Sequence, residues 1–217
     1  MLCPVTSPVG STFGNQSSIL KSILAPDINF VLWQRNLSSF IDAWASEIRW
    51  DKSENLEGEV DRESLDEFEE DLYNELKKWR TREPDMTRWV ASDMCANIRL
   101  FMDTTQAQEV FVKIEPVSDD MCRLFHVDKN LLRMLCTYVG EGTLWLQNDK
   151  VERQYLGCGE NKDIVLDPLA IYQAPKLDVL ILKGERWINN LIGGAVHRSP
   201  PLRVGDKRLL LKVDFIK

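Results

Sequence analysis

The sequence predicts an α+β protein in which a closed or sandwich-like β architecture has helices packed against its outside. Three segments between residues 36 and 101 repeat apolar residues at helical spacing. After residue 108, eight short β-rich segments are separated by Gly, Pro, Asn and Asp, with no helical pattern between them. Sheets and helices bury their apolar faces by packing in layers, and closure of a sheet removes edges that would invite aggregation.

The order of these segments divides the chain into three parts. Residues 1–26 are rich in Ser, Pro and Gly and are expected to form a loose leader. Residues 27–105 hold the helical patterns, and residues 106–217 hold the β-rich patterns and are expected to form a β-barrel core. A chain of 217 residues is long enough for one sizeable domain with such a helical extension.

Each helix is predicted from one apolar stripe. The first lies in residues 36–50 and the second in residues 64–79, where Ser64 and Glu67 match a capping box and Pro84 follows as the expected end. The third follows Thr87. The stripes consist of Leu37, Phe40, Ile41, Trp44 and Ile48; Leu65, Phe68, Leu72, Leu76 and Trp79; and Trp89, Val90, Met94, Ile98 and Phe101.

The predicted strands are short and rich in β-branched and aromatic residues. Alternate side chains of a strand point to the same face, so each strand presents one face to the interior of a barrel and the other outward. The strands cover residues 109–117, 122–128, 131–139, 142–146, 163–167, 177–184, 194–199 and 208–215.

The charge of the chain is unevenly distributed. The net charge is −7, which argues against a nucleic-acid partner. The first 108 residues hold 11 Lys and Arg against 19 Asp and Glu, whereas the remainder holds 16 against 15. The acidity therefore belongs to the helical part, and the β-rich part can tolerate an anionic ligand.

The cysteines and the apolar runs indicate the cellular location of the protein. The five cysteines are odd in number and widely spaced, without a C-x-x-C pair, which favours reduced thiols and a cytoplasmic location. The N-terminus has no signal-peptide pattern, and no apolar run approaches the length of a membrane span, so no membrane partner is expected.

Both histidines of the chain lie in the β-rich part. His126 and Asp128 form an H-x-D pair whose side chains share one face of a strand. With His197 they provide two imidazoles and one carboxylate, the facial set that holds non-haem Fe(II) and leaves further positions open. Arg208 opens the last strand, where its guanidinium can grip a carboxylate with two hydrogen bonds. The alternative is two structural histidines and an arginine in an ordinary ion pair.

Three other residues have both a structural and a functional interpretation. Trp145 is either a core tryptophan or a residue at the barrel mouth that contacts a substrate. Lys183 is either a lysine with a buried stem or a partner for an anionic substrate. Ser199 is expected to share the face of His197, near the metal or hydrogen-bonded to one of its outer partners.

Two other kinds of site are alternatives. A zinc site of Cys122, His126, Asp128 and Cys136 is conceivable, although the spacing fits no standard zinc pattern. A Cys–His hydrolase is possible in principle, although no cysteine lies in a recognisable nucleophile turn.

Four stretches together resemble the core of the Fe(II)/2-oxoglutarate-dependent dioxygenase superfamily: "FHVDKNLLRMLCTYVG", "LDVLILKGERW", "GAVHRSPP" and "RLLLKVDF". Prolyl-hydroxylase-like and AlkB-like members share the H-x-D, a Tyr-containing strand, a distal His and an Arg about one strand later. "FHVD…TYVGEGTLWL…VHRSPP…RLLLKVD" is more closely similar to a bacterial family known as a domain of unknown function. The resemblance covers roughly residues 105–216, whereas the stretch "GCGENKDIVLDP" matches no pattern.

The resemblance implies a double-stranded β-helix, that is, a jelly-roll or cupin-like barrel, with Fe(II) and 2-oxoglutarate as cofactors. It implies that His126, Asp128 and His197 are metal ligands, that Arg208 binds the distal carboxylate of 2-oxoglutarate, and that Tyr138 donates a hydroxyl to the same group. Arg203 or Lys207 is an alternative to Arg208. The implied activity is that of an oxygenase, a hydroxylase of a small molecule or of a side chain.

Two further hypotheses come from other functional classes. The same three ligands can hold Zn(II) or Fe(II) in a cupin-like protein that uses no 2-oxoglutarate. The barrel can also be a scaffold for an interaction module, in which the acidic, tryptophan-containing helices dock a partner.

Overall fold

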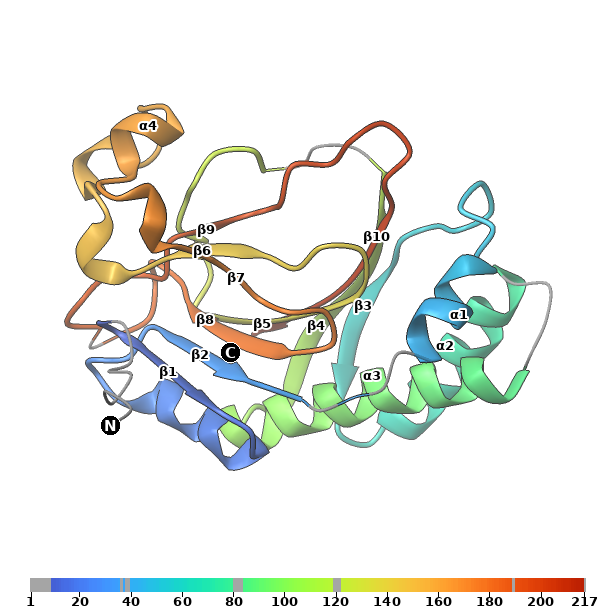
Figure 1. The fold of residues 1–217 in the computed structure, drawn as a ribbon. Coiled ribbons are helices and arrows are strands. Elements are labelled where there is room, and N and C mark those ends of the chain that lie inside the picture. The colour runs from blue at the N-terminus through green and yellow to red at the C-terminus, as the bar shows by residue number, and fades with distance from the viewer. Residues whose placement is uncertain are drawn as a thin grey trace, which may run out of the picture.

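Two sheets that face one another form the centre of the molecule (Figure 1). The computed structural model describes residues 9–35, 37, 40–79, 84–118, 122–188 and 190–216. The larger sheet has the strand order β1-β2-β8-β5-β10-β4-β3, and the smaller sheet has the order β7-β6-β9. Only β1 and β2 pair in parallel among the described strands.

The strands follow these bounds: β1 Ser11–Gly14, β2 Phe30–Trp33, β3 Leu56–Asp61, β4 Glu109–Val117, β5 Leu132–Val139, β6 Leu144–Leu146, β7 Ile171–Gln173, β8 Val179–Lys183, β9 His197–Arg198 and β10 Arg208–Phe215. The helices are α1 Phe40–Ser46, α2 Leu65–Lys78, α3 Pro84–Thr105 and α4 Asn161–Ile164. Short 3-10 helices cover Ser17–Leu24, Asn148–Lys150, Arg153–Tyr155 and Pro168–Ala170.

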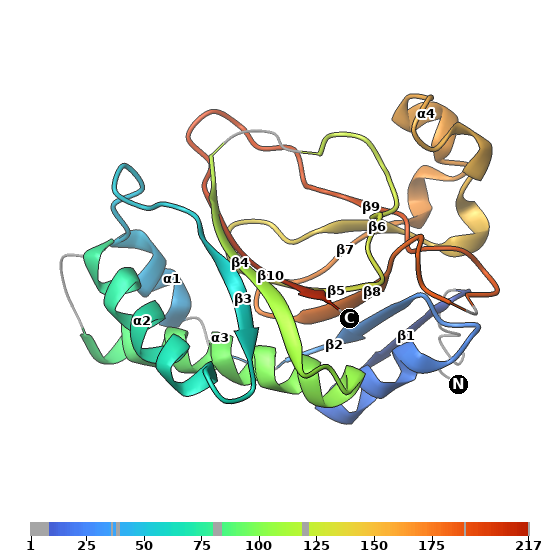
Figure 2. The same ribbon diagram turned by 180° about the vertical axis from the view of Figure 1, so that it is seen from behind.

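The helices α1 to α3 cover the outer face of the larger sheet. Figure 1 shows α3 running under this sheet, and Figure 2 shows the same layer from behind. Strand alternation sends Leu209, Leu211 and Val213 of β10 to this side, where they join the stripes of α2 and α3 in one buried cluster. Each fully buried Leu or Ile contributes about 1.5–3 kcal/mol, so this cluster is a main source of stability.

The opposite face of the larger sheet looks toward the smaller sheet. Phe30, Leu180 and Leu210 point into this interior and pack against Trp145 of β6. The outer face of the smaller sheet is covered by residues 148–170, which pack through Val151 and Ile164 in a third cluster. The chain therefore has three layers of core, and only the middle one lies between the two sheets.

Several predicted elements are confirmed and others differ. The α+β class and the apolar stripes of α2 and α3 are confirmed, although the side chain of Phe40 lies outside the described residues. The expected capping box is wrong, because the hydroxyl of Ser64 donates to Asp61 and caps no amide of α2. The first helix, α1, is shorter than predicted and ends at Ser46. Pro84 begins α3, and α2 has already ended at Lys78.

The N-terminal segment also differs from the expected loose leader. From residue 9 it is folded, and β1 adds a strand to the edge of the larger sheet, while residues 1–8 lie outside the described part. Both β2 and β3 lie in the part expected to be helical. These three strands are four to six residues long, too short for a clear period-2 pattern to separate them from loops.

The predicted strand at residues 163–167 is wrong. Its first part belongs to α4, which begins in a capping box formed by Glu160 and Asp163, and only Val165 makes an isolated β-bridge. The strand that enters the smaller sheet is β7, a few residues later. The predicted strand at 122–128 is reduced to one bridge at His126.

Candidate metal centre

His126 and His197 lie side by side at the edge of the smaller sheet. Their backbones form an antiparallel bridge in which each amide donates to the carbonyl of the other at 3.0 Å. Phe125 and Val127 pack in the cluster on the outer face of this sheet. Since successive side chains alternate, His126 and Asp128 point to the inner face.

The three side chains converge on one point. One ligand atom from each of His126, Asp128 and His197 lies within 4.8 Å of the others, and no other such group of three occurs among the described residues. Nε2 of His197 is 3.3 Å from Oδ2 of Asp128, and Nε2 of His126 is 3.6 Å from Oδ1. The ring centroids of the histidines are 4.7 Å apart.

Backbone carbonyls orient both imidazole rings. Nδ1 of His126 lies 2.9 Å from the carbonyl oxygen of Leu124, and Nδ1 of His197 lies 3.1 Å from that of Ala195. A ring that donates through Nδ1 keeps its lone pair on Nε2, and this is how ligating histidines are commonly held. Both Nε2 atoms therefore face Asp128 as potential ligand atoms.

Arg133 holds the carboxylate of Asp128 in place. Its Nη1 lies 2.8 Å from Oδ2 of Asp128, while its Nε and Nη2 each donate to Asp214 at 2.7 Å. The contact with Asp128 is an ion pair that lacks the alignment of a hydrogen bond, so Oδ2 is buried without a hydrogen bond among the described residues. This oxygen therefore has charged and polar neighbours but no hydrogen bond, and it can still donate a lone pair to a ligand.

The charges of the cluster are coupled. Burial alone would raise the pKa of Asp128, but the facing imidazoles of His126 and His197 and the charge of Arg133 hold that pKa well below its ordinary value. The interaction with Asp128 raises the pKa of His126 against the opposing effect of burial. The carboxylate is therefore anionic at neutral pH, as a metal ligand must be.

Arg208 is buried at the start of β10, with 2% of its surface exposed. Its Nη2 donates to the hydroxyls of Thr137 and Thr143 at 3.1 and 2.8 Å, and its Nε has no hydrogen bond. No carboxylate of the described residues pairs with it, and burial lowers its pKa to about 10. Of the three cations considered for this role, Arg203 is exposed and Lys207 is half-buried, so Arg208 is the one inside the barrel.

Thr143 and Thr137 share the interior with the candidate ligands. Trp145 pairs with His197 across β6 and β9, and Thr143 lies two residues before Trp145 on the same face. The turn after β5 lies close to the start of β10 and needs a glycine, because Gly140 has a φ of +80° and a Cβ there would lie 2.4 Å from the carbonyl oxygen of Lys207.

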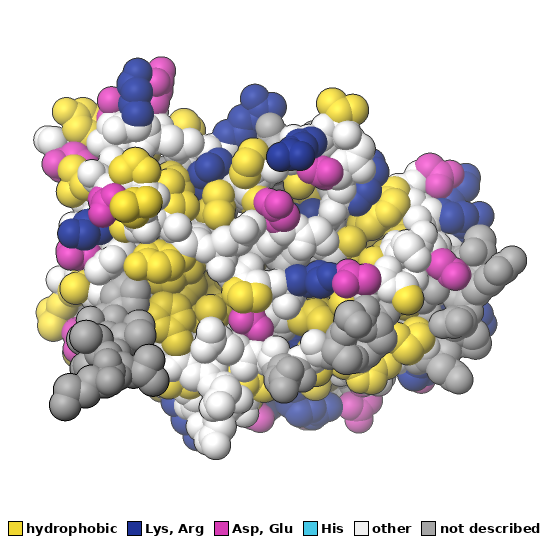
Figure 3. Space-filling view, in the orientation of Figure 1, with side chains coloured by type: hydrophobic (Ala, Val, Ile, Leu, Met, Phe, Trp, Pro, Cys, Tyr) yellow, Lys and Arg dark blue, Asp and Glu magenta, His cyan; other side chains and the backbone are white. Residues whose placement is uncertain are grey.

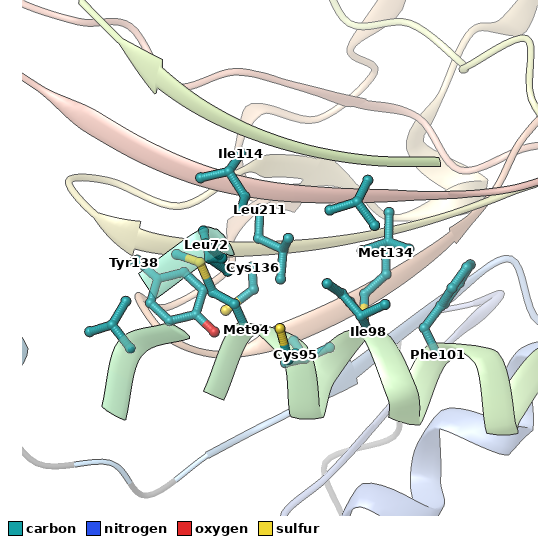
Figure 4. Close-up of a cluster of buried hydrophobic side chains, with 14 of the residues drawn as sticks. Leu72, Met94, Cys95, Ile98, Phe101, Ile114, Met134, Cys136, Tyr138 and Leu211 are labelled. Carbon is teal, nitrogen blue, oxygen red and sulfur yellow. The ribbon is translucent and has the colours of Figure 1, made fainter. Parts of the chain in front are cut away.

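Tyr138 does not reach Arg208, and its expected role is corrected. It follows Thr137 on β5 and therefore points to the helix side of the larger sheet, where Figure 4 shows its hydroxyl directed toward α3. The hydroxyl donates to Asp93 at 2.5 Å and accepts from Asn97 at 3.0 Å. The hydroxyls beside Arg208 belong to Thr137 and Thr143.

Lys183 also lies on the helix side and does not line the centre. Its Nζ donates to the carbonyl oxygen of Ala25 and lies 5.9 Å from the centroid of the Trp187 ring. Burial lowers its pKa to about 8. Of the two interpretations of Lys183, the structure fits a lysine with a buried stem, and its amino group is also held inside the fold by a backbone carbonyl.

Trp145 is a core residue with 3% of its surface exposed. It stacks on Phe30 and Tyr172, with centroid distances of 4.1 and 4.7 Å, and fills the space between the sheets. Ser199 follows β9 and is half-buried, without a hydrogen bond of its side chain among the described residues. Neither residue has a contact that places it against a ligand.

The cysteine-based alternatives receive no support from the described residues. Cys136 lies in the helix-side cluster, across the larger sheet from His126, and burial raises its pKa to about 12. The group of potential metal ligands contains neither Cys136 nor Cys122. A thiol with such a pKa is protonated at neutral pH and is a poor nucleophile.

A cavity of about 770 Å³ opens beside the centre. His126 and Asp128 line one side of it, and its other polar walls are Lys129, Arg153, Glu185 and Asn190.

Figure 3 shows one face of the molecule, with acidic and basic side chains interspersed and no histidine visible. None of the helices in the described part of the chain has the length and hydrophobicity that crossing a membrane requires.

Sequence reasoning missed several residues of the site. Arg133 and Asp214 are both charged residues on strands, and such a pair across neighbouring strands is a weak signal without the strand register. Thr137 and Thr143 carried no signal that separated them from other strand threonines. Arg153 lies between two predicted strands, 142–146 and 163–167, so nothing in the sequence linked it to His126.

The fold is similar to those of solved structures that include oxygenases. The structure of the dioxygenase for auxin oxidation in rice has a TM-score of 0.52 at 10% identity, with 96% of this chain and 83% of that chain covered. A full-length Neurospora crassa protein in complex with alpha-KG has a TM-score of 0.45 at 13% identity, with coverage of 92% and 78%. A Pseudomonas putida prolyl-4-hydroxylase has a TM-score of 0.44 at 10% identity, with coverage of 93% and 98%.

At these identities, structural similarity shows the fold alone. The similarity to the rice structure confirms the predicted double-stranded β-helix. No curated protein sequence matches the chain. One family does match, over residues 14–214, and its description is "Protein of unknown function (DUF1826)". Because the match spans nearly the whole chain, this protein belongs to the DUF1826 family.

Proposed function

We propose that this protein is a non-haem Fe(II)- and 2-oxoglutarate-dependent oxygenase. The observation that carries the proposal is the convergence of His126, Asp128 and His197 inside the barrel. Both imidazoles direct Nε2 toward the carboxylate of Asp128, and the oxygen nearer His197, Oδ2, has no hydrogen bond among the described residues. The double-stranded β-helix and the rice dioxygenase that shares it support the proposal.

The donor set fits Fe(II) better than it fits a structural zinc ion. A structural zinc site is closed by four protein ligands, commonly with thiolates, and none of the described cysteines joins this group. Two imidazoles and one carboxylate occupy one face of an octahedral ion and leave the other positions open. Arg133 would keep Asp128 oriented as the third ligand.

Arg208 fits the role of anchor for 2-oxoglutarate. A buried guanidinium with no anionic partner among the described residues is costly, and a carboxylate held by two charge-assisted hydrogen bonds would offset that cost. Thr137 and Thr143 fix one nitrogen, so the guanidinium has a defined direction. When bound, the iron and 2-oxoglutarate would supply oxidation by molecular oxygen, which the side chains of the protein cannot perform.

The chain itself would bind, orient and shield. The Nδ1 bonds keep both imidazoles in one tautomer, and the imidazoles together with Arg133 keep Asp128 ionised. Trp145, Phe30 and Leu210 fill the adjacent interior and exclude water from it. The substrate, a small molecule or a side chain, would approach through the 770 Å³ cavity, which His126 and Asp128 line. Nucleic acid and membranes are not among the proposed partners.

The test is oxygen-dependent turnover of 2-oxoglutarate by the iron-loaded protein. We expect succinate to form slowly even without substrate, and we expect His126→Ala and Asp128→Ala to lose both Fe(II) binding and turnover. We expect Arg208→Gln to raise the KM for 2-oxoglutarate roughly 10- to 100-fold, because hydrogen bonds to charged groups are worth about 1.5–3 kcal/mol. Circular dichroism of each variant checks that it is folded.

The outcomes separate the hypotheses. Metal binding that depends on the three ligands, without succinate and without an effect of Arg208→Gln, would indicate a cupin-like metal protein. Failure of the folded protein to bind Fe(II), Co(II) or Zn(II) would overturn the proposal and favour an interaction module.

A further inference from the structure

The cavity beside the metal centre contains a second arginine whose charge is not neutralised. Arg153 lies in a short 3-10 helix of the segment 148–170 and lines the cavity together with His126 and Asp128. It forms no ion pair with any described residue, and burial lowers its pKa. Arg133, also close to the centre, contacts both Asp128 and Asp214. Arg153 therefore presents a guanidinium without an anion to the cavity, and a guanidinium in this position can bind one.

A structural role accounts for only part of Arg153. Its Nη2 donates to the carbonyl oxygen of Gly194 at 3.0 Å and to the side chain of Asn148 at 2.5 Å, so it ties the segment to the following loop. The guanidinium packs on bare backbone at Gly193, where φ is +79° and a Cβ would lie 2.8 Å from Nη1. Nε and Nη1 donate to no described residue, and neither is sealed from solvent.

The other charges of the cavity favour an anion. Lys129 also lines it, is exposed, and forms no ion pair within the described residues. Glu185 is the opposing acidic group, and Asp128 is already paired with Arg133. A divalent ion held by two neutral imidazoles and Asp128 would add further positive charge, so the cavity as a whole would attract negative groups.

We propose that the cavity binds a substrate that carries an oxyanion, a carboxylate or a phosphate, and that Arg153 is the residue that receives it, with Lys129 adding attraction. The fork of a guanidinium fits both oxyanions. The apolar walls, Leu156 and Trp187, would contact the body of the same molecule. The assignment to the substrate rests on the proposed function, whereas the oxyanion subsite itself does not.

The test uses three fluorinated probes of similar size: 4-fluorobenzoate, 4-fluorophenyl phosphate and the neutral 4-fluorobenzamide. Binding is followed by broadening of the ¹⁹F resonance in the metal-free protein, and again with Co(II) and saturating 2-oxoglutarate under argon. We expect at least one anionic probe to bind about tenfold or more tightly than the amide. The ratio of the two anions identifies the oxyanion that the subsite prefers.

Matched variants assign the preference to its residue. Arg153→Gln is expected to abolish the preference for the anionic probes over the amide, and Arg153→Lys is expected to keep part of it. Lys129→Gln is expected to reduce this preference by less than Arg153→Gln does. Arg99→Gln is the control, since Arg99 pairs with Asp66 on the exposed surface of the helical layer. Arg208→Gln should retain the preference, which separates this subsite from the anchor of 2-oxoglutarate.

Two results would overturn the inference: equal binding of the amide and both anions by the unaltered protein, or an unchanged preference in Arg153→Gln. The Co(II) absorption spectrum reports separately on the metal centre. A protein that binds no Co(II) but shows an Arg153-dependent preference would refute the proposed function and retain the oxyanion subsite. A normal Co(II) spectrum without any preference for the anionic probes would retain the metal centre of the proposed function and refute the oxyanion subsite.

Discussion

The two faces of the larger sheet each bury an arginine, and the two arginines differ in their partners. On the helix side, Arg35 pairs with Asp93, and the same carboxylate accepts from Tyr138 and Asn97. On the barrel side, Arg208 has two threonine hydroxyls, no described carboxylate and an unpaired Nε. Consecutive residues of β5, Thr137 and Tyr138, point to the two centres.

The difference indicates which centre is structural. None of the hydrogen-bonding atoms around Asp93 is buried without a partner, so that network is complete as the chain folds. On the barrel side, Nε of Arg208 and Oδ2 of Asp128 are buried without a hydrogen bond among the described residues, although Oδ2 forms an ion pair with Arg133. Buried polar networks are stabilising when complete and costly when incomplete, so the incomplete one is where ligands are expected.

The largest effect is expected from Asp93→Ala. It leaves Arg35 buried without its anion, and breaking a buried ion pair costs about 3–5 kcal/mol. Urea unfolding should show this loss in the free energy of unfolding. Asp66→Ala is the control, because its carboxylate is 89% exposed in a surface pair with Arg99 and should change that free energy by at most about 1 kcal/mol. Equal losses in the two variants would contradict the account.

Replacing each arginine by methionine should sharpen the comparison. Arg35→Met is expected to lower the free energy of unfolding by several kcal/mol, roughly as much as Asp93→Ala, because it orphans Asp93. Arg208→Met removes a buried charge that has no anion among the described residues, so we expect a change within about 1 kcal/mol or a gain. A loss in Arg208→Met as large as that in Arg35→Met would show that Arg208 is structural.

A third prediction concerns pH and Lys183. Its folded pKa is about 8, against 10.5 for an ordinary lysine. Below pH 8 both folded and unfolded chains carry the proton, and the cost of burying the charge is fully present. Between pH 8 and 10.5 the unfolded chain binds more protons, so stability should rise with pH through this window. In Lys183→Met that rise in stability should be smaller. The same dependence of stability on pH in the variant and the unaltered protein would show that Lys183 is not its cause.

Sequence reasoning was most successful where periodicity and chemistry agreed. The stripes of α2 and α3 and the strands β4, β5, β8 and β10 are apolar patterns that residue type and local periodicity determine. The pairing of His126, Asp128 and His197 followed from residue type and alternation, and the structure brings them together as expected. Arg208 was placed correctly at the start of β10 and inside the barrel.

Two failures of prediction, at Tyr138 and Lys183, have a common cause, which is strand register. Tyr138 is one residue from Thr137, and this offset of one residue moves a hydroxyl to the opposite face of the sheet. Lys183 ends β8 on the helix side for the same reason. Other failures have other causes. The edge strand β1 forms by pairing with β2, and Arg153 lies in a short 3-10 helix that is tied to Gly194, so short-range patterns carried no information about either.

The most direct measurement is X-ray diffraction from crystals of the Fe(II)-loaded protein, with anomalous data collected at the iron edge. The account predicts a single strong anomalous peak bound by Nε2 of His126, Nε2 of His197 and an oxygen of Asp128, with Arg133 still on that carboxylate. A peak elsewhere, or iron-soaked crystals with no peak between these side chains, would contradict it.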